Sequence, residues 1–264
     1  AQLDQLMAEA YALRGYAELM LVNIYAHQVK VNGTDFSSEP GIVVLDQAPI
    51  EALSQVSRST VGESYSAILS DFDNAISHFD AAGGDRGSIL YMNKAAVYGL
   101  LARTNLYLEN WGDAKQYAQQ ALTEKGIKTL TYDATAYAAL FSGNTSNTES
   151  LLSLAITQVD NWSANSAGTL WSTYNYSPSP KLQALYGAND CRTSIFGWSD
   201  ESTAAAPVFT GGKYSQHSSN NPAYATNYLV NAPEMYLIMA EADVETGDLS
   251  NARNSLLTVA KRNA

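Results

Sequence analysis

The residues best suited to chemistry in this sequence are aromatic and polar side chains that alternate between residues 160 and 200. Three of the four tryptophans lie there, namely Trp162, Trp171 and Trp198. Interleaved with them are Asp160, Asn161, Asn165, Tyr174, Asn175 and Tyr176. Aromatic rings stack on the C–H faces of sugars, Asn and Asp pair with hydroxyls, and such mixtures are typical of ligand pockets. The segment predicts a carbohydrate-binding site; the alternative is that these rings pack the loops onto a helical core.

Carboxylates near these aromatics raise the alternative of a helical glycoside hydrolase. Such enzymes place two carboxyl groups about 5–10 Å apart across the scissile bond. The candidates are Glu149, Asp160, Asp190, Asp200 and Glu201. Because acidic residues are common in loops, the pattern favours hydrolysis only weakly. We expect Asp190 and Arg192 to form a structural ion pair.

Other reactions find less support in the sequence. The histidines His27, His78 and His217 lack the spacing of a metal motif such as H-E-x-x-H. Cys191 is the single cysteine and has no evident partner base, so we expect neither a nucleophilic thiol nor an internal disulfide. A G-x-S-x-G elbow is also missing. We therefore predict a protein that is not an enzyme and has no cofactor or metal.

The composition excludes several classes of partner. The 264 residues carry a net charge of −11, whereas nucleic acids and anionic membranes select surfaces rich in Lys and Arg. Only 16% of the residues are charged, so neutral polar side chains and the 17 tyrosines must finish much of the surface. The sequence contains no apolar stretch of about 18 residues, the length that crosses a bilayer.

Apolar periodicity predicts a mainly helical chain. From residue 3 to 25 a stripe recurs at steps of three and four: Leu3, Leu6, Ala10, Leu13, Ala17, Met20 and Ile24. A polar insertion at about 28–57 precedes a second helix, which Thr60 and Glu63 begin with a capping box. Its buried stripe is predicted to be Tyr65, Ile68, Phe72, Ala75 and Phe79. Further helices are expected at 93–110, at 114–124 and from 232, after Asn231. Between about 126 and 230 the pattern predicts loops and a short strand within 149–158.

The last two helices repeat the third and fourth at a constant offset of 138 residues. Tyr236, Met239, Ala240, Ala252, Leu256 and Val259 correspond to Tyr98, Leu101, Ala102, Ala114, Ala118 and Ala121. We assign a Gly-Asp to each turn, at 112–113 and 247–248. Small residues where antiparallel helices approach closely are typical of tetratricopeptide-like hairpins; ordinary hairpins without a repeat are the alternative. The first two helices are expected to form a third pair, and Trp111 to be a core residue.

Several of these segments resemble the SusD/RagB family of nutrient-binding lipoproteins. The resemblance rests on "AEAYALRGYAELMLVNIYA", "GIVVLDQAP", "RSTVGESYSAILSDFDNAI", "KAAVYGLLARTNLYLENWGDAKQYAQQAL", "SPKLQALYGANDCRTSIF", and "GGKY" followed by "APEMYLIMAEADVETGDLSNARNSLL". It implies one mainly α domain over 1–264, with a tetratricopeptide-like helical frame at about 1–125 and 231–264. It also implies a large irregular, ligand-facing region at about 126–230 and short β elements.

The resemblance also implies a role in nutrient uptake. SusD-like proteins are outward-facing outer-membrane lipoproteins of Bacteroidetes. They capture glycans, or in some members peptides, without catalysis and cap a SusC-like TonB-dependent transporter. The insertion "KVNGTDFSSEPG" is a second candidate for ligand contact, or for the face toward the transporter. The family's N-terminal lipid-bearing cysteine and its Glu- and Arg-rich segment after the last hairpin are missing, so we expect a chain truncated at both ends, with any lipid anchor outside it.

Overall fold

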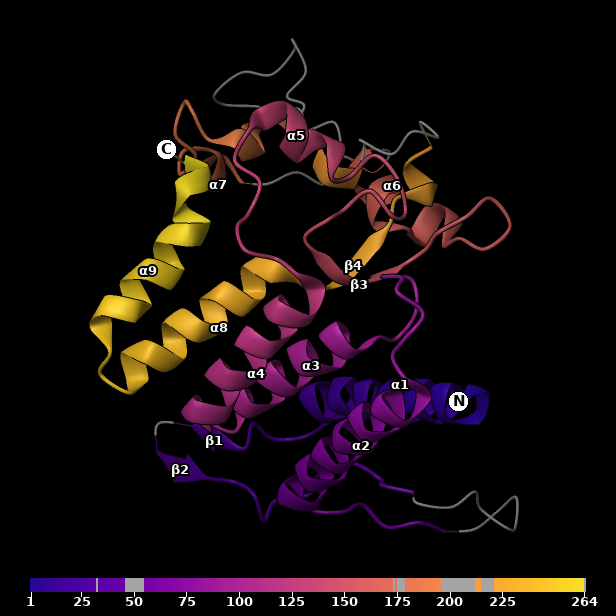
Figure 1. Cartoon of the computed structure of the whole chain (residues 1–264). Helices are drawn as coiled ribbons and strands as arrows, with labels where there is room; N and C mark the ends of the chain where they lie inside the picture. Colours follow the sequence, from indigo (N-terminus) through magenta and orange to yellow (C-terminus); the bar gives the residue numbers. More distant parts are fainter. Residues whose placement is uncertain are drawn as a thin grey trace. The chain divides into compact units, whose positions relative to one another are not determined.

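The computed structural model describes residues 1–31, 33–45, 55–172, 174, 179–195, 212–214 and 221–263 (Figure 1). The described chain is mainly helical with short strands, which confirms the predicted fold class. It forms two compact units. The first comprises Ala1–Gly87, Tyr91–Gly126 and Ile238–Ala252, and the second Ser88–Leu90, Ile127–Leu237 and Arg253–Ala264. The boundary passes through the last two helices. The single domain implied by the resemblance stays a prediction.

In the first unit, helices α1 (Gln2–Tyr25) and α2 (Val61–Ala82) form the expected antiparallel pair. Asp4 lies 3.2 Å from His78 Nδ1 near one end, and Arg14 donates two hydrogen bonds to Asp71 farther along. The predicted stripe of α2 is fully confirmed as buried.

The capping box of α2 is also confirmed. Glu63 N donates to Thr60 Oγ1 at 3.1 Å, and Thr60 N donates to Glu63 Oε2 at 2.8 Å. These two bonds satisfy backbone donors that the first turn of a helix leaves without partners. The Thr60–Glu63 pair therefore fixes where the chain leaves the insertion and enters α2.

Helix α1 packs through a different stripe from the one that its large side chains predict. Its buried residues are Ala8, Ala12, Gly15, Glu18, Leu19 and Val22. The predicted stripe is exposed in the described chain, with Leu3 at 71% and Ile24 at 63%. The close approach of α1 and α2 explains why the stripe of small residues is the one that packs, because a Cβ on Gly15 would lie 2.9 Å from Cε1 of Phe72. The helix was predicted correctly, but its packing face was not.

The insertion after α1 contains a minimal hairpin of strands β1 (Lys30–Val31) and β2 (Thr34–Asp35). An isolated bridge then joins Pro40 to Thr60. The next residue, Gly41, approaches α2 so closely that a Cβ would lie 2.4 Å from Thr60 O. This contact holds the end of the insertion against the start of α2.

Helices α3 (Lys94–Tyr107) and α4 (Trp111–Lys125) form one predicted hairpin, and α8 (Ala232–Glu245) and α9 (Leu249–Ala260) form the other. Their turns match at the predicted offset. Glu109 and Gly247 both have left-handed backbone, with φ of 58° and 82°. Asn110 N donates to Asn105 O at 2.9 Å, and Asp248 N donates to Asp243 O at 2.8 Å. This hydrogen-bond pattern supports the repeat.

The alanines of the repeat are buried as predicted, at Ala102, Ala114, Ala118, Ala121, Ala240 and Ala252. Three details differ from the expected repeat. Gly112 and Asp113 lie in the first turn of α4 rather than in the connection, and Trp111, expected in the core, is only partly buried. Leu256, which corresponds to the buried Ala118, is 52% exposed.

In the second unit, β3 (Ser150–Leu154) pairs antiparallel with β4 (Asn227–Asn231). The strand was predicted, but its simple alternation was not confirmed. Two register shifts interrupt the ladder, so Leu151 and Leu152 are both buried whereas Leu154 is 45% exposed. Helix α5 (Ala134–Ala139) and the 3₁₀ turn η2 (Cys191–Ile195) pack beside each other, and together with the residues after α5 they supply a small core of Tyr137, Leu140, Phe141, Cys191 and Ile195.

Short helical turns account for the remaining described elements of the second unit. They are η1 (Ser163–Asn165), α6 (Ala167–Ser172), α7 (Pro180–Gln183), η3 (Gly212–Tyr214), η4 (Pro222–Tyr224) and η5 (Lys261–Asn263). Among the described residues, none of the helices combines the length and apolar character needed to cross a bilayer.

Candidate functional site

The predicted aromatic segment begins with a tight loop after β3. Thr157 N donates to Asp160 O at 2.8 Å, and Asp160 N donates back to Thr157 Oγ1 at 3.1 Å. The chain then turns into η1, where Ser163 has a left-handed φ of 48°. Such backbone is uncommon for a residue with a side chain. The loop leaves the side chain of Trp162 60% exposed.

Asn161 fixes this loop from within. Its Nδ2 donates to Thr157 O at 3.0 Å and to Gln158 O at 2.9 Å. Its Oδ1 accepts from Ser163 N at 2.9 Å. Both donors and one acceptor site of the carboxamide are therefore hydrogen-bonded to the backbone around Trp162. Asn161 positions the indole more than it offers groups to a ligand.

A cavity of about 270 Å³ lies beside Trp162. It is lined by Leu154, Ala155, Ile156, Asp160, Asn161 and Trp162. Asn144 holds the apolar wall, because its Nδ2 donates to Ile156 O at 3.2 Å and its Oδ1 accepts from Ile156 N at 3.3 Å. The arrangement combines an exposed aromatic face, a short apolar wall and the exposed carboxylate of Asp160.

The segment that follows Trp162 is braced by α6 and η4. Thr169 Oγ1 donates to Ser163 O at 3.0 Å, and Ser166 Oγ accepts from Thr169 N at 3.0 Å. Gly168 leaves no room for a side chain, since a Cβ would lie 2.1 Å from Pro222 O. These contacts make the backbone next to Trp162 a packed structure rather than a free loop.

The structure brings together only part of the predicted site. Trp162 and Asn161 line the cavity, whereas the exposed residues Asn165 and Tyr174 lie beyond its described lining. The side chain of Trp171, and Asn175, Tyr176 and Trp198, lie outside the described residues. Sequence reasoning missed the wall of Leu154, Ala155 and Ile156. The alternation of Leu154 and Ile156 predicted a strand but not that its end would face a cavity.

Two of the five carboxylates considered for hydrolysis, Glu149 and Asp190, are engaged in ion pairs. Glu149 and Arg262 form a buried ion pair. Arg192 donates to Asp190 at 2.9 and 2.6 Å, which confirms the expected structural pair. Burial alone would raise the pKa of Asp190, but these hydrogen bonds hold it below its ordinary value. Asp160 is exposed, and Asp200 and Glu201 lie outside the described residues.

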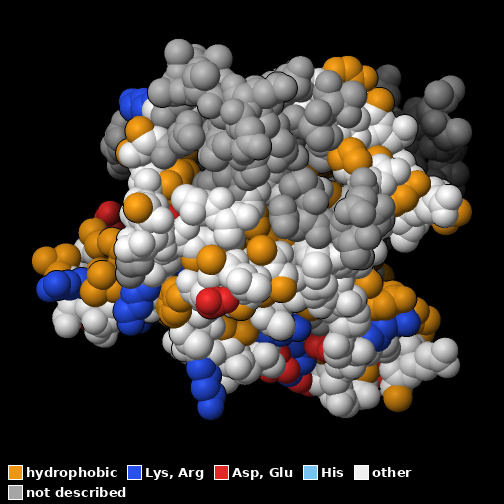
Figure 2. Space-filling view, turned by 90° about the horizontal axis from the view of Figure 1, so that it is seen from above, with side chains coloured by type: hydrophobic (Ala, Val, Ile, Leu, Met, Phe, Trp, Pro, Cys, Tyr) orange, Lys and Arg blue, Asp and Glu red, His pale blue; other side chains and the backbone are white. Residues whose placement is uncertain are grey.

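The Cys191 thiol and the possible metal ligands of the described chain are not arranged for catalysis either. The Cys191 thiol is buried, and burial raises its pKa, which keeps it protonated and unreactive. No group of three or more His, Cys, Asp or Glu side chains in the described ranges is arranged to hold a metal ion. On the face shown in Figure 2, hydrophobic side chains are dispersed among Lys, Arg, Asp and Glu side chains.

Comparisons with known proteins found one matching protein family and several solved structures with a similar fold. Residues 1–108 match the model of a SusD-like family described as "Starch-binding associating with outer membrane". A search of curated proteins found no matching sequence. The solved structures with a similar fold include a SusD superfamily protein from Bacteroides thetaiotaomicron. That protein is 21% identical, with a TM-score of 0.81 over 99% of this chain and 59% of its own.

Two structures from Bacteroides vulgatus are similar to the same extent. One is a putative sugar binding protein, 24% identical, with a TM-score of 0.82 over 98% of this chain and 57% of its own. The other is a SusD-like carbohydrate binding protein, 20% identical, with a TM-score of 0.78 over 99% and 55%. This chain thus spans less than two thirds of the length of these structures. The family match over residues 1–108 and the fold shared with these SusD-like structures agree with the predicted resemblance.

Proposed function

We propose that this chain captures a neutral glycan without altering it. The observation that carries the proposal is Trp162, whose indole is 60% exposed beside a cavity in a SusD-like chain. An aromatic ring beside a cavity that also has apolar and polar lining residues is the composition expected of a ligand site. The family description and the names of two similar structures support carbohydrate as that ligand.

The cavity offers complementary groups to a sugar. The indole face can stack on the C–H face of a pyranose ring. The Asp160 carboxylate accepts hydrogen bonds from hydroxyls, and charge-assisted bonds of this kind are the stronger ones. Leu154 and Ile156 supply an apolar wall. Since Asn161 already fixes the loop, binding would require little ordering of the protein.

The proposal includes the cellular setting that the resemblance implies. The protein would face outward at the outer membrane, held by a lipid anchor outside this chain. It would deliver the glycan to a SusC-like TonB-dependent transporter. The family description of outer-membrane association supports this setting. Peptides are the alternative ligand, since some SusD-like proteins capture them.

Calorimetric titration with starch fragments, other oligosaccharides and peptides tests the proposal, with each mixture analysed afterwards for cleavage. We expect saturable binding of an intact glycan. Trp162→Ala should weaken it about tenfold or more, because aromatic contacts contribute roughly 0.5–1.5 kcal/mol beyond the area they bury. Val159→Ala is the matched control, since Val159 is 95% exposed in the same loop. Binding of peptides alone, cleavage of the glycan, or equal affinity in the Trp162 variant would each contradict the proposal.

A further inference from the structure

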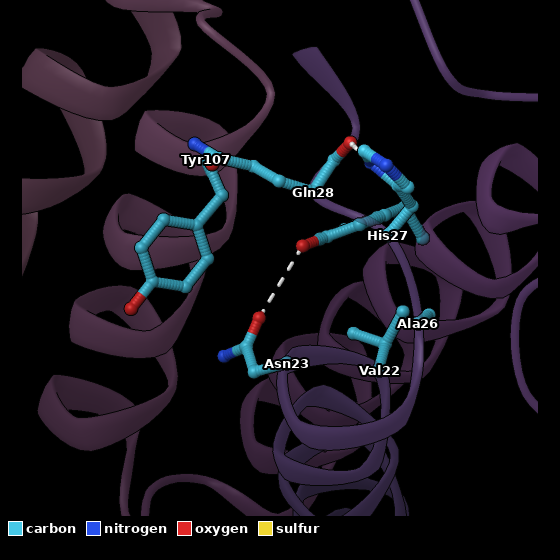
Figure 3. Close-up of a pocket in the computed structure, with 7 residues that line it drawn as sticks. Val22, Asn23, Ala26, His27, Gln28 and Tyr107 are labelled. Atoms are coloured by element: carbon cyan, nitrogen blue, oxygen red, sulfur yellow. Dashed lines mark hydrogen bonds between the residues drawn. The ribbon is translucent and has the colours of Figure 1, made fainter. Parts of the chain in front are cut away.

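A second pocket lies in the first unit, among the end of α1, the residues after it, α2 and α3. Its volume is about 270 Å³. Val22 and Tyr65 are almost fully buried and form its floor, whereas Asn23, His27 and Gln28 are exposed at its rim. Tyr107 of α3 completes the wall. Figure 3 shows the Asn23 carboxamide and the Tyr107 ring on opposite sides of one opening, with Gln28 spanning its top.

The rim of this pocket is tied down on both sides. Lys30 Nζ donates to Leu108 O at 3.1 Å, which fastens the chain after Gln28 to the end of α3. Arg58 Nη2 donates to Tyr25 O at 2.9 Å, which fastens the end of α1. The His27 ring stacks on Phe36 with centroids 4.0 Å apart. The pocket is therefore formed before any ligand arrives.

The hydroxyl of Tyr65 carries the argument for a ligand. The residue is 4% exposed, and its hydroxyl donates to Asn23 Oδ1 over a long 3.4 Å. Burial raises the pKa of Tyr65 to about 12, with a further contribution from Tyr107, so the hydroxyl stays protonated. A buried hydroxyl normally makes better hydrogen bonds, because leaving polar groups poorly satisfied costs free energy. A ligand hydroxyl in the pocket could accept the proton of Tyr65 and donate to its oxygen.

The chemistry of the lining selects a neutral partner. Two carboxamides, two phenols and an imidazole face this space, and its described lining contains no carboxylate, ammonium or guanidinium group. Carboxamides donate and accept at the same site, as sugar hydroxyls do. The volume lies just below the range of roughly 300–1,000 Å³ that accommodates drug-sized ligands. The space therefore suits one sugar ring rather than a chain.

We propose that this pocket is a second carbohydrate subsite, which takes a single uncharged sugar residue through Asn23, Gln28 and Tyr65. The choice of sugar as the ligand rests on the proposed function; the pocket itself does not. The Trp162 cavity belongs to the second unit and this pocket to the first, so the two can be tested separately.

The test is a titration of ¹⁵N-labelled protein with methyl glycosides of glucose, galactose, mannose and N-acetylglucosamine, followed by nuclear magnetic resonance. At least one should shift the side-chain amide signals of Asn23 and Gln28 along a saturating curve. Tyr65→Phe and Asn23→Ala should each weaken that response about tenfold, since one lost hydrogen bond is worth about 1.4 kcal/mol. Asn74→Ala removes an exposed carboxamide from α2 and should change nothing. Trp162→Ala should also leave the response intact.

The contrary outcomes separate the two proposals. Shifts confined to the Trp162 indole, or an unchanged response in both pocket variants, would overturn the second subsite while leaving glycan capture standing. A calorimetrically bound glycan with no methyl glycoside response at Asn23 and Gln28 would do the same. Absence of any sugar response at both sites would overturn both. Thermal unfolding of each variant identifies any loss that comes from misfolding.

Discussion

Arg262 and Glu149 form an ion pair in which each side chain is only 7% exposed, although 113 residues separate them in the sequence. Both are further engaged. Glu149 Oε1 accepts from Thr131 N at 2.6 Å, and the Arg262 guanidinium lies 4.9 Å from the centre of the Tyr137 ring. The pair thus fastens the C-terminal turn η5 to the start of β3 within the second unit.

Replacing Arg262 should destabilise the second unit strongly. Arg262→Met leaves the Glu149 carboxylate buried without its cation, and breaking one side of a buried pair costs about 3–5 kcal/mol. We expect a corresponding fall in the free energy of unfolding, measured by urea denaturation. Glu149→Gln in the same background should recover part of it, because the buried charge is then gone. The exposed Arg253→Met is the control; an equal loss there would argue against a special role for the pair.

Truncating a side chain in the buried stripe of α1 should destabilise the protein, whereas truncating one in the exposed stripe should change its stability little. Leu19 is fully buried, so Leu19→Ala should cost about 2–5 kcal/mol of stability. Leu13 is 56% exposed, so Leu13→Ala should change stability by no more than about 0.5 kcal/mol. Thermal unfolding of the two variants makes the comparison within one helix. A larger loss for Leu13→Ala would mean that the exposed stripe is packed in the protein in solution.

Helix α1 shows that a periodic sequence pattern can predict a helix without predicting which of its faces is buried. Its period predicts a helix because both stripes recur every three to four residues. The period does not say which stripe packs, because that depends on the partner. Helix α2 presents Phe72 and therefore needs Gly15 opposite it. By contrast, the predicted capping box and the repeat of the hairpins depend on local spacing, and both were confirmed.

Glu18 should make the first unit more stable as the pH falls. It is 8% exposed, and Oε2 lacks a hydrogen-bond partner in the part of the chain that the structure describes. Burial raises the pKa of Glu18 above its ordinary 4.5, and nearby Asp71 adds to the rise while Arg14 opposes it. The folded state therefore binds the proton more tightly than the unfolded state. Between 4.5 and the raised pKa, stability falls as pH rises.

Glu18→Gln tests this directly. The variant should unfold at a higher temperature than the parent at pH 7, and the difference should shrink as the pH approaches 4. Each unit of pKa difference corresponds to about 1.4 kcal/mol. Glu39→Gln, at an exposed position, should show no such trend. A parent stability that is flat from pH 7 to 4, or one that falls equally in both proteins, would contradict the account.

Gly168 should be needed to hold the predicted binding segment in place. Its Cβ position lies 2.1 Å from the backbone oxygen of Pro222, and a backbone atom cannot move aside cheaply. Gly168→Ala should therefore separate α6 from η4, increase protease cleavage between residues 160 and 225 and weaken glycan binding. Gly112→Ala is the control, because that Cβ position has open space within a helix. Unchanged protease resistance in the Gly168 variant would show that the contact is not required.

The candidate site was only partly predictable, for a reason visible at Asn161. An Asn beside a Trp has the composition of a sugar site, but composition does not show how a carboxamide is used. Here the local backbone uses it. The Asp190–Arg192 ion pair was predicted from its local spacing, whereas the partner of Glu149, Arg262, was not. Glu149 and Arg262 are 113 residues apart, so no local sequence pattern predicts their pairing.

Variants at Asn161 and Asn165 should distinguish a side chain that positions the Trp162 indole from one that contacts the glycan. Asn161→Ala removes two donated hydrogen bonds and one accepted bond from the loop, so Ser163 loses the partner of its amide. We expect faster hydrogen exchange at Ser163 and glycan binding weakened about tenfold through loss of order around Trp162. Asn165→Ala changes an exposed side chain and should leave the exchange at Ser163 unaltered. If Asn161→Ala weakens binding without faster exchange, Asn161 contacts the glycan instead of positioning the indole.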